Sequence, residues 1–269
     1  MAQRQSTIGS VESTAVRGGA EVPGPEIEIT SNWGPLLQQR CPGGSGGASS
    51  VTASAMHPDV SETWVLTHLL TEDECAHLVA EMEIHGFGTT NYSQAYRGNL
   101  RLQTVDASLA AALWARMCDC VPHTVELAGA TWRAVGLNER FRLSKYRQGD
   151  RFCVHKDAFF RRPRVEGREE EWSAFTVNVY LNQDFEGGKT RFYDAGARRG
   201  AVDPIDHLIY ALEPATGTAC VFRQPPGAHL LHDGEAVSRG FKYLLRTDVM
   251  YRRLPGSEGK GRGEGVQGA

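Results

Sequence analysis

Two residues near the middle of the chain have the types and the spacing of metal ligands. His155 and Asp157 are separated by one residue, Lys156. In an extended segment, successive side chains point to opposite faces, so the imidazole and the carboxylate lie on the same face. They would be two of the three protein ligands of a 2-His-1-carboxylate site, which binds Fe(II) and leaves positions on the metal open for other ligands. A His-x-Asp pair alone is a weak signal, so the site needs a second histidine.

The second histidine must come from a later strand. The best candidate is His232, in the sequence LLHDG of residues 230–234. His229 lies three residues earlier and is the nearest competitor, although alternation places it on the opposite face of a strand. Five other histidines are interpreted as structural, and these are His57, His68, His85, His123 and His207.

A lysine follows the second histidine inside an apolar run. Lys242 lies in the sequence FKYLL of residues 241–245. A buried ammonium group is costly unless an anion pairs with it, and the natural anion beside such an iron site is the far carboxylate of 2-oxoglutarate. Alternation places Arg246 on the same face as Lys242, so the sequence leaves the two as alternatives for this task.

The elements that must position these residues are short strands supported by two helices. Thr71 and Glu74 form a capping box that opens the first helix, which we expect to end at Gly86. The second helix is expected from about Ala107 to Cys118. The strand candidates, separated by glycine and proline turns, are Phe141–Tyr146, Ala174–Leu181, Thr190–Tyr193, His207–Leu212, Thr218–Arg223, His229–His232 and Phe241–Tyr251. This pattern predicts a mainly β fold with supporting helices (α+β), a double-stranded β-helix of the jelly-roll or cupin-like type.

Composition excludes some classes of partner. The chain has 269 residues and a formal net charge of -3, which gives no reason to expect nucleic acid or an anionic membrane as a partner. No apolar run approaches the roughly 18 residues of a membrane span. The six cysteines lack paired zinc-type spacing and are interpreted as reduced thiols. Since the first residues also lack the apolar core of a secretory signal, we expect a cytoplasmic protein.

Composition also divides the chain. Residues 1–60 are rich in Gly, Ser, Thr, Ala and Pro and are expected to be a disordered or weakly ordered extension, with a local anchor possible around Trp33. Residues 61–254 are expected to form the catalytic domain. Residues 255–269 are glycine-rich and charged and are expected to be a disordered tail.

The motifs taken together resemble the 2-oxoglutarate- and Fe(II)-dependent dioxygenases of the prolyl 4-hydroxylase type. The resemblance covers roughly residues 62–252. The matching positions are Tyr146, Gly149, Phe152, His155, Asp157, Tyr180-Leu181, Gly187-Gly188-Lys189-Thr190, Leu231-His232-Asp233-Gly234 and Lys242. Eight ordered pieces at compatible spacing are a far stronger signal than any one of them.

The resemblance implies an oxidoreductase that uses Fe(II), 2-oxoglutarate and O2. It also leads us to expect ascorbate as a cofactor. The residues at the iron-binding and catalytic positions are His155, Asp157 and His232. Lys242 would bind the 5-carboxylate of 2-oxoglutarate with help from Tyr146 and Thr190, and Arg246 remains its rival. The hard chemistry would belong to the metal and the co-substrate.

The prime substrate is the least determined feature. Phe152 stands where prolyl hydroxylases usually have Tyr, which predicts a more apolar pocket near the iron. The segment Ala158–Trp172 follows a metal ligand directly and carries aromatic residues, so we expect it to cover the site. These features favour a small-molecule substrate. The alternatives are a peptidyl-prolyl 4-hydroxylase and a non-catalytic cupin-like binding protein, because a fold does not specify a substrate.

Overall fold

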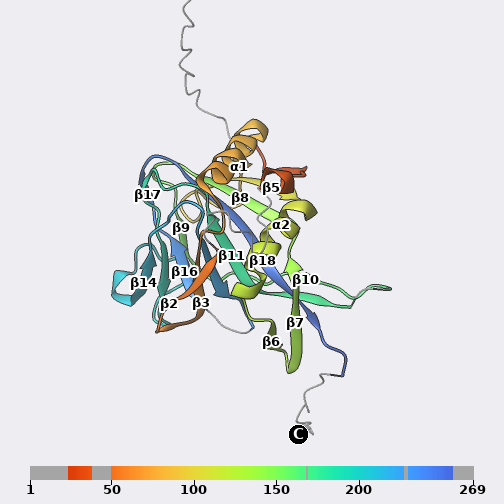
Figure 1. Ribbon diagram of the computed structural model, residues 1–269. Coiled ribbons are helices and arrows are strands. Elements are labelled where there is room, and N and C mark those ends of the chain that lie inside the picture. Colours follow the sequence, from red (N-terminus) through yellow and green to blue (C-terminus); the bar gives the residue numbers. More distant parts are fainter. Residues whose placement is uncertain (1–23, 38–49, 168, 227–229, 257–269) are drawn as a thin grey trace, which may run out of the picture.

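The computed structural model describes residues 24–37, 50–167, 169–226 and 230–256, in which strands dominate (Figure 1). The helices are α1 (Glu72–His85), α2 (Ala107–Met117) and the short 3-10 helices η1 (Gly34–Leu36), η2 (Cys118–Cys120) and η3 (Ile205–His207). None of these described helices has the length and the apolar character needed to cross a membrane.

The strands form a large sheet, a small sheet and a two-stranded ribbon. The order along the large sheet is β1 (Ile27–Thr30), β5 (Leu100–Val105), β8 (Arg140–Tyr146), β18 (Lys242–Arg253), β11 (Glu171–Tyr180), β15 (Ala219–Arg223), β3 (Val60–Thr67) and β2 (Thr52–His57). Strands that pair beside this path are β4 (Gly88–Thr89), β6 (Thr124–Leu127), β7 (Ala130–Leu137) and β10 (Arg161–Arg162). The small sheet has the order β14 (Leu208–Leu212), β13 (Thr190–Tyr193), β16 (Leu231–Gly234) and β9 (Phe152–His155), and the ribbon pairs β12 (Glu186–Gly187) with β17 (Val237–Arg239).

The chain passes repeatedly between the large and the small sheet. β8, β11, β15 and β18 lie in the large sheet, whereas β9, β13, β14 and β16 lie in the small one. Neighbours among these eight strands are antiparallel. The sheets face each other, since Phe192 of β13 packs edge-on against Phe222 of β15 with ring centroids 5.5 Å apart. This is the double-stranded β-helix that the sequence predicts, so the fold class is confirmed.

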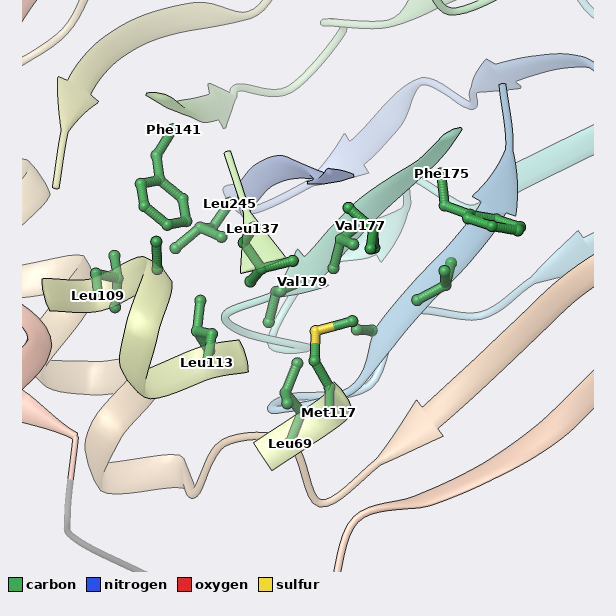
Figure 2. Close-up of a cluster of buried hydrophobic side chains, with 14 of the residues drawn as sticks. Leu69, Leu109, Leu113, Met117, Leu137, Phe141, Phe175, Val177, Val179 and Leu245 are labelled. Carbon is green, nitrogen blue, oxygen red and sulfur yellow. The ribbon is translucent and has the colours of Figure 1, made fainter. Parts of the chain in front are cut away.

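The helices cover the outer face of the large sheet. Leu113 and Met117 of α2 belong to one buried cluster with Val177 of β11 and Leu245 of β18 (Figure 2). Leu245 points toward the helices. Since side chains alternate along a strand, Lys242, Leu244 and Arg246 point the other way, toward the small sheet. The helical support therefore determines which face of β18 is available for a site.

The predicted helix boundaries are confirmed closely. Thr71 Oγ1 accepts a hydrogen bond from the backbone of Glu74, and the Glu74 carboxylate accepts one from the backbone of Thr71. α1 ends at Gly86, whose φ of +76° favours glycine. α2 ends one residue before the predicted Cys118, where η2 begins.

Part of the predicted N-terminal extension pairs with the sheet. β1 runs parallel to β5, and β2 pairs with β3. Asp106, the N-cap of α2, accepts hydrogen bonds from the Ser31 hydroxyl and the Trp33 backbone, and Trp33 is buried. Residues 1–23, 38–49 and 257–269 lie outside the described residues, so the division of the chain at residues 60 and 254 stays a prediction.

Candidate metal centre and co-substrate pocket

Strand register brings the three predicted metal ligands together. His155 ends β9 and pairs directly with His232 of β16, and their ring centroids are 4.2 Å apart. Asp157 lies two residues beyond β9. One possible ligand atom from each of the three residues lies within 4.8 Å of the other two. Nearby ligand atoms of these types could hold one metal ion.

Both imidazoles have the orientation that metal binding requires. Nδ1 of His155 lies 2.9 Å from the carbonyl oxygen of Cys153, and Nδ1 of His232 lies 3.2 Å from that of Leu230. A carbonyl oxygen can only accept, so each Nδ1 donates and each Nε2 keeps its lone pair. The two Nε2 atoms lie 3.7 Å and 3.8 Å from the Asp157 carboxylate oxygens. The free lone pairs therefore point toward one centre.

The electrostatic environment keeps the ligands in their metal-binding forms. Burial raises the pKa of Asp157, but Arg246 and the two histidines outweigh burial and hold this pKa well below its usual range. Burial and the neighbouring His155 lower the pKa of His232 to about 3. At neutral pH the site thus offers a carboxylate and a neutral imidazole, and the donor set fits Fe(II).

A chain of buried hydrogen bonds orients Asp157. Thr176 of β11 donates from Oγ1 to Asp157 Oδ2 over 2.7 Å, and Gln224 Nε2 donates to the same Thr176 oxygen over 2.8 Å. Ser173 in turn donates to Gln224 Oε1 over 2.6 Å. These bonds hold Oδ2 of Asp157 in place, and Oδ1 is left facing Nε2 of His155.

We expect Thr176→Val to weaken Fe(II) binding about 10- to 100-fold, the usual cost of losing a partner of a metal ligand. Valine keeps the shape of threonine but cannot donate to Asp157. Anaerobic titration with Fe(II) measures the effect, and Thr52→Val, at an exposed strand threonine, is the matched control. Unchanged Fe(II) affinity in Thr176→Val would show that this hydrogen bond does not support the site.

The two cations that the sequence leaves as alternatives have different partners. Arg246 Nη2 lies 3.2 Å from Asp157 Oδ2 and 3.4 Å from Asp248 Oδ1, so this arginine is paired. Lys242 is 3% exposed and donates to the carbonyl oxygen of Gly188. Within the described ranges, no ion pair within 4.0 Å includes Lys242, although it lines the same cavity as the triad. The geometry therefore favours Lys242 as the cation free to bind a ligand.

The predicted helpers lie beside Lys242. Tyr146 pairs with Lys242 across β8 and β18, and the Lys242 ammonium lies 5.6 Å from the Tyr146 ring centroid. Thr190 is buried, and its hydroxyl lies 2.7 Å from the hydroxyl of Tyr180. Gly188 has a φ of +69°, and a Cβ there would lie 3.2 Å from Lys242 Cδ. The glycine pair before Thr190 thus leaves room for the lysine side chain.

Sequence reasoning missed several residues that line the cavity. The missed residues that border it are Arg97, Arg142, Ser144 and Asn178. Arg97 precedes β5 and forms an isolated bridge with Phe152, a pairing that no local motif indicates. The expectation of an apolar lining is wrong, because two arginines border the triad in addition to Lys242 and Arg246. His229 lies outside the described residues, and the five histidines interpreted as structural do not line the cavity.

The segment expected to cover the site belongs to a β-hairpin. β10 pairs with β11 through Arg161 and Trp172, and the hairpin extends away from the barrel (Figure 1). Phe159 packs against Trp172 with ring centroids 5.2 Å apart, and neither residue lines the cavity. Instead, Phe152 covers the metal centre: its ring stacks on that of His155 with centroids 3.5 Å apart.

Comparison with known proteins agrees with this geometry. Residues 141–247 match the family described as the 2OG-Fe(II) oxygenase superfamily. No curated protein matches the chain. Similar solved structures include a viral collagen prolyl hydroxylase from Paramecium Bursaria Chlorella virus-1 in complex with 2OG (TM-score 0.48, 16% identity, covering 72% of this chain and 98% of that chain). Others are a prolyl-4-hydroxylase from Pseudomonas putida (TM-score 0.44, 17% identity, 72% and 93%) and an oxidoreductase of the 2OG-Fe(II) oxygenase family from Burkholderia pseudomallei (TM-score 0.44, 12% identity, 87% and 98%).

The family match includes the three predicted metal ligands and Lys242. His155, Asp157, His232 and Lys242 all lie between residues 141 and 247, and the three metal-binding side chains converge with free lone pairs on one centre. Residues 141–247 therefore match the 2OG-Fe(II) oxygenase superfamily, and the protein is a 2-oxoglutarate-dependent non-haem iron dioxygenase.

Proposed function

We propose that this dioxygenase oxidises a C–H bond of a small molecule, most simply by hydroxylation, with succinate and CO2 as co-products. The observation that supports a small substrate is the enclosure of the metal centre. His155 and His232 are only 6% and 4% exposed, and Phe152 lies directly on His155. Arg97 in turn lies over Phe152, 4.2 Å from its ring centroid. An enclosed centre favours a substrate that can enter whole.

The roles of the residues follow from their positions. His155, Asp157 and His232 would hold Fe(II), and Lys242, with Tyr146 and Thr190, would hold the far carboxylate of 2-oxoglutarate. Bound Fe(II) and 2-oxoglutarate supply the oxidative chemistry with O2.

The surrounding residues position these groups and exclude water. Thr176 and Arg246 hold one oxygen of Asp157, so that the carboxylate keeps its orientation. Phe152 shields one face of the His155 ring from water. A dry site strengthens each electrostatic contact in it.

The proposal is tested by loading the protein with Fe(II) and 2-oxoglutarate without O2, admitting O2, and measuring succinate release with a panel of small molecules and of proline-containing peptides. Stimulation by small molecules supports the proposal. Strong hydroxylation of peptidyl proline would instead make the enzyme a prolyl 4-hydroxylase. If the protein failed to bind 2-oxoglutarate, the remaining alternative would be a non-catalytic cupin-like binding protein. The cytoplasmic location and the exclusion of nucleic acid and membrane as partners stay predictions.

We expect 2-oxoglutarate binding to weaken above pH 8. Burial lowers the pKa of Lys242 to about 8, so the free enzyme loses this positive charge as the pH rises through that value. Because the carboxylate needs the charged ammonium, each further pH unit should raise the Kd by up to about tenfold. Anaerobic titrations at several pH values measure this slope. Lys242→Arg keeps its charge throughout and should flatten the profile; a flat profile in the unchanged protein would contradict the role of Lys242.

A further inference from the structure

The cavity at the metal centre holds more positive charge than the co-substrate needs. Four cationic side chains line it: Arg97, Arg142, Lys242 and Arg246. Arg246 is paired with Asp157 and Asp248, and Lys242 is assigned above to 2-oxoglutarate. Arg97 and Arg142 remain to be explained.

Neither of these two arginines has a close carboxylate partner. Arg97 donates from Nε to the Asn99 side chain over 2.8 Å, and within the described ranges no carboxylate lies within 4.0 Å of it. The nearest ion-pair partner of Arg142 is Asp248, whose Oδ2 is 3.9 Å from Nη1 and which already serves Arg246. Both guanidinium groups thus have hydrogen-bonding capacity to spare.

A third arginine, Arg101, adds a positive charge that acts on both of them. Arg101 is 7% exposed, and its Nε and Nη2 atoms find no hydrogen-bond partner among the described residues. Its Nη1 atom lies 3.2 Å from Glu26. Burial, together with the charges of Arg101 and Arg246, lowers the pKa of Arg97 to about 10. The protein therefore keeps mutually repelling cations together without enough anions of its own, which is unfavourable unless a ligand compensates.

Binding of Fe(II) and 2-oxoglutarate does not remove this excess. The metal ion adds two positive charges, and the co-substrate adds two negative charges. Asp157 and Asp248 offset two of the four lining cations, so a net charge of about two remains. Asp233 also borders the cavity, but Arg191 binds its two oxygens over 2.9 Å and 2.6 Å. The charge that is left over must be met by the prime substrate.

We propose that the prime substrate is a small carboxylic acid whose carboxylate binds Arg97 and Arg142. This inference rests on the proposed function and adds the substrate class to it. Planar guanidinium groups bind carboxylates through paired hydrogen bonds. Arg97 stacks on Phe152, and Phe152 stacks on His155, so one aromatic ring separates the Arg97 guanidinium from a metal ligand. A substrate held there by its carboxylate presents a nearby C–H bond to the metal centre.

The test compares acids with their uncharged amides on the Fe(II)- and 2-oxoglutarate-loaded enzyme without O2. The probes are propionate, benzoate and phenylacetate beside propionamide, benzamide and phenylacetamide, with inorganic phosphate as another anion, and calorimetry measures binding. We expect at least one acid to bind about 10- to 100-fold more tightly than its amide, as a charge-assisted hydrogen bond predicts. Equal binding of every acid and its amide, or no binding of any acid, would overturn the proposal. Phosphate binding as tightly as the best acid would overturn the assignment to carboxylates.

Substitutions of the two arginines test where the substrate carboxylate binds. Arg97→Gln and Arg142→Gln should each weaken binding of the best acid at least tenfold and change the Kd of 2-oxoglutarate less than threefold. Arg239→Gln is the matched control, since Arg239 is 76% exposed and pairs with Glu186. If both cavity variants bind the acid normally, the site lies elsewhere and the inference fails. If the protein binds 2-oxoglutarate but oxidises neutral compounds, this inference alone is overturned. If the unchanged protein does not bind 2-oxoglutarate at all, the proposed function is overturned.

Discussion

Replacing His155, Asp157 or His232 by alanine is expected to abolish Fe(II)-dependent succinate formation. The three side chains converge within 4.8 Å, and among the described residues no other His, Cys, Asp or Glu belongs to this group of possible ligands. Two steps measure the effect: Fe(II) titration without O2, and then succinate release after O2 is admitted. We expect no measurable turnover and a large loss of Fe(II) affinity in each variant.

His229→Ala is the control for this experiment, because His229 is the competing candidate three residues before His232. It should retain turnover. If His232→Ala turned over normally while His229→Ala did not, the assignment of the second histidine would be wrong. Thermal unfolding of each variant separates loss of the metal from loss of the fold.

Lys242→Ala is expected to weaken 2-oxoglutarate binding by about 2–5 kcal/mol, the range for leaving one member of a buried charge pair unpaired. The effect should be large because Lys242 is almost fully buried and no carboxylate among the described residues pairs with it. Tyr146→Phe and Thr190→Ala remove only a hydroxyl and should cost about 1–3 kcal/mol each. Calorimetric titration with 2-oxoglutarate at saturating Fe(II) measures all three.

Arg246→Ala distinguishes the two rival cations. Because Arg246 contacts Asp157, its loss should lower the affinity for Fe(II) first, and the affinity for 2-oxoglutarate at saturating Fe(II) should change little. If Arg246→Ala raised the 2-oxoglutarate requirement and Lys242→Ala did not, the two roles would have to be exchanged.

Local chemistry made much of this protein predictable from its sequence. The capping box of Thr71 and Glu74 involves residues three apart, so a short sequence contains everything needed to form it. The common face of His155 and Asp157 follows from strand alternation alone. The match to the superfamily could be predicted because its motifs occur in a fixed order and spacing, even though the residues meet only after folding.

Contacts between distant segments decided the rest. β1 and β5 were not predicted, because their pairing is determined by register with segments far away in the chain. The choice between Lys242 and Arg246 depended on which one meets the carboxylate of Asp157, and this carboxylate reaches Arg246 only in the folded barrel. Arg97 and Arg142 enter the cavity from outside every motif. Sequence spacing thus determined the chemistry of the centre, whereas tertiary packing determined the charges around it, because a charge is paired by its neighbours in space and not by its neighbours in the chain.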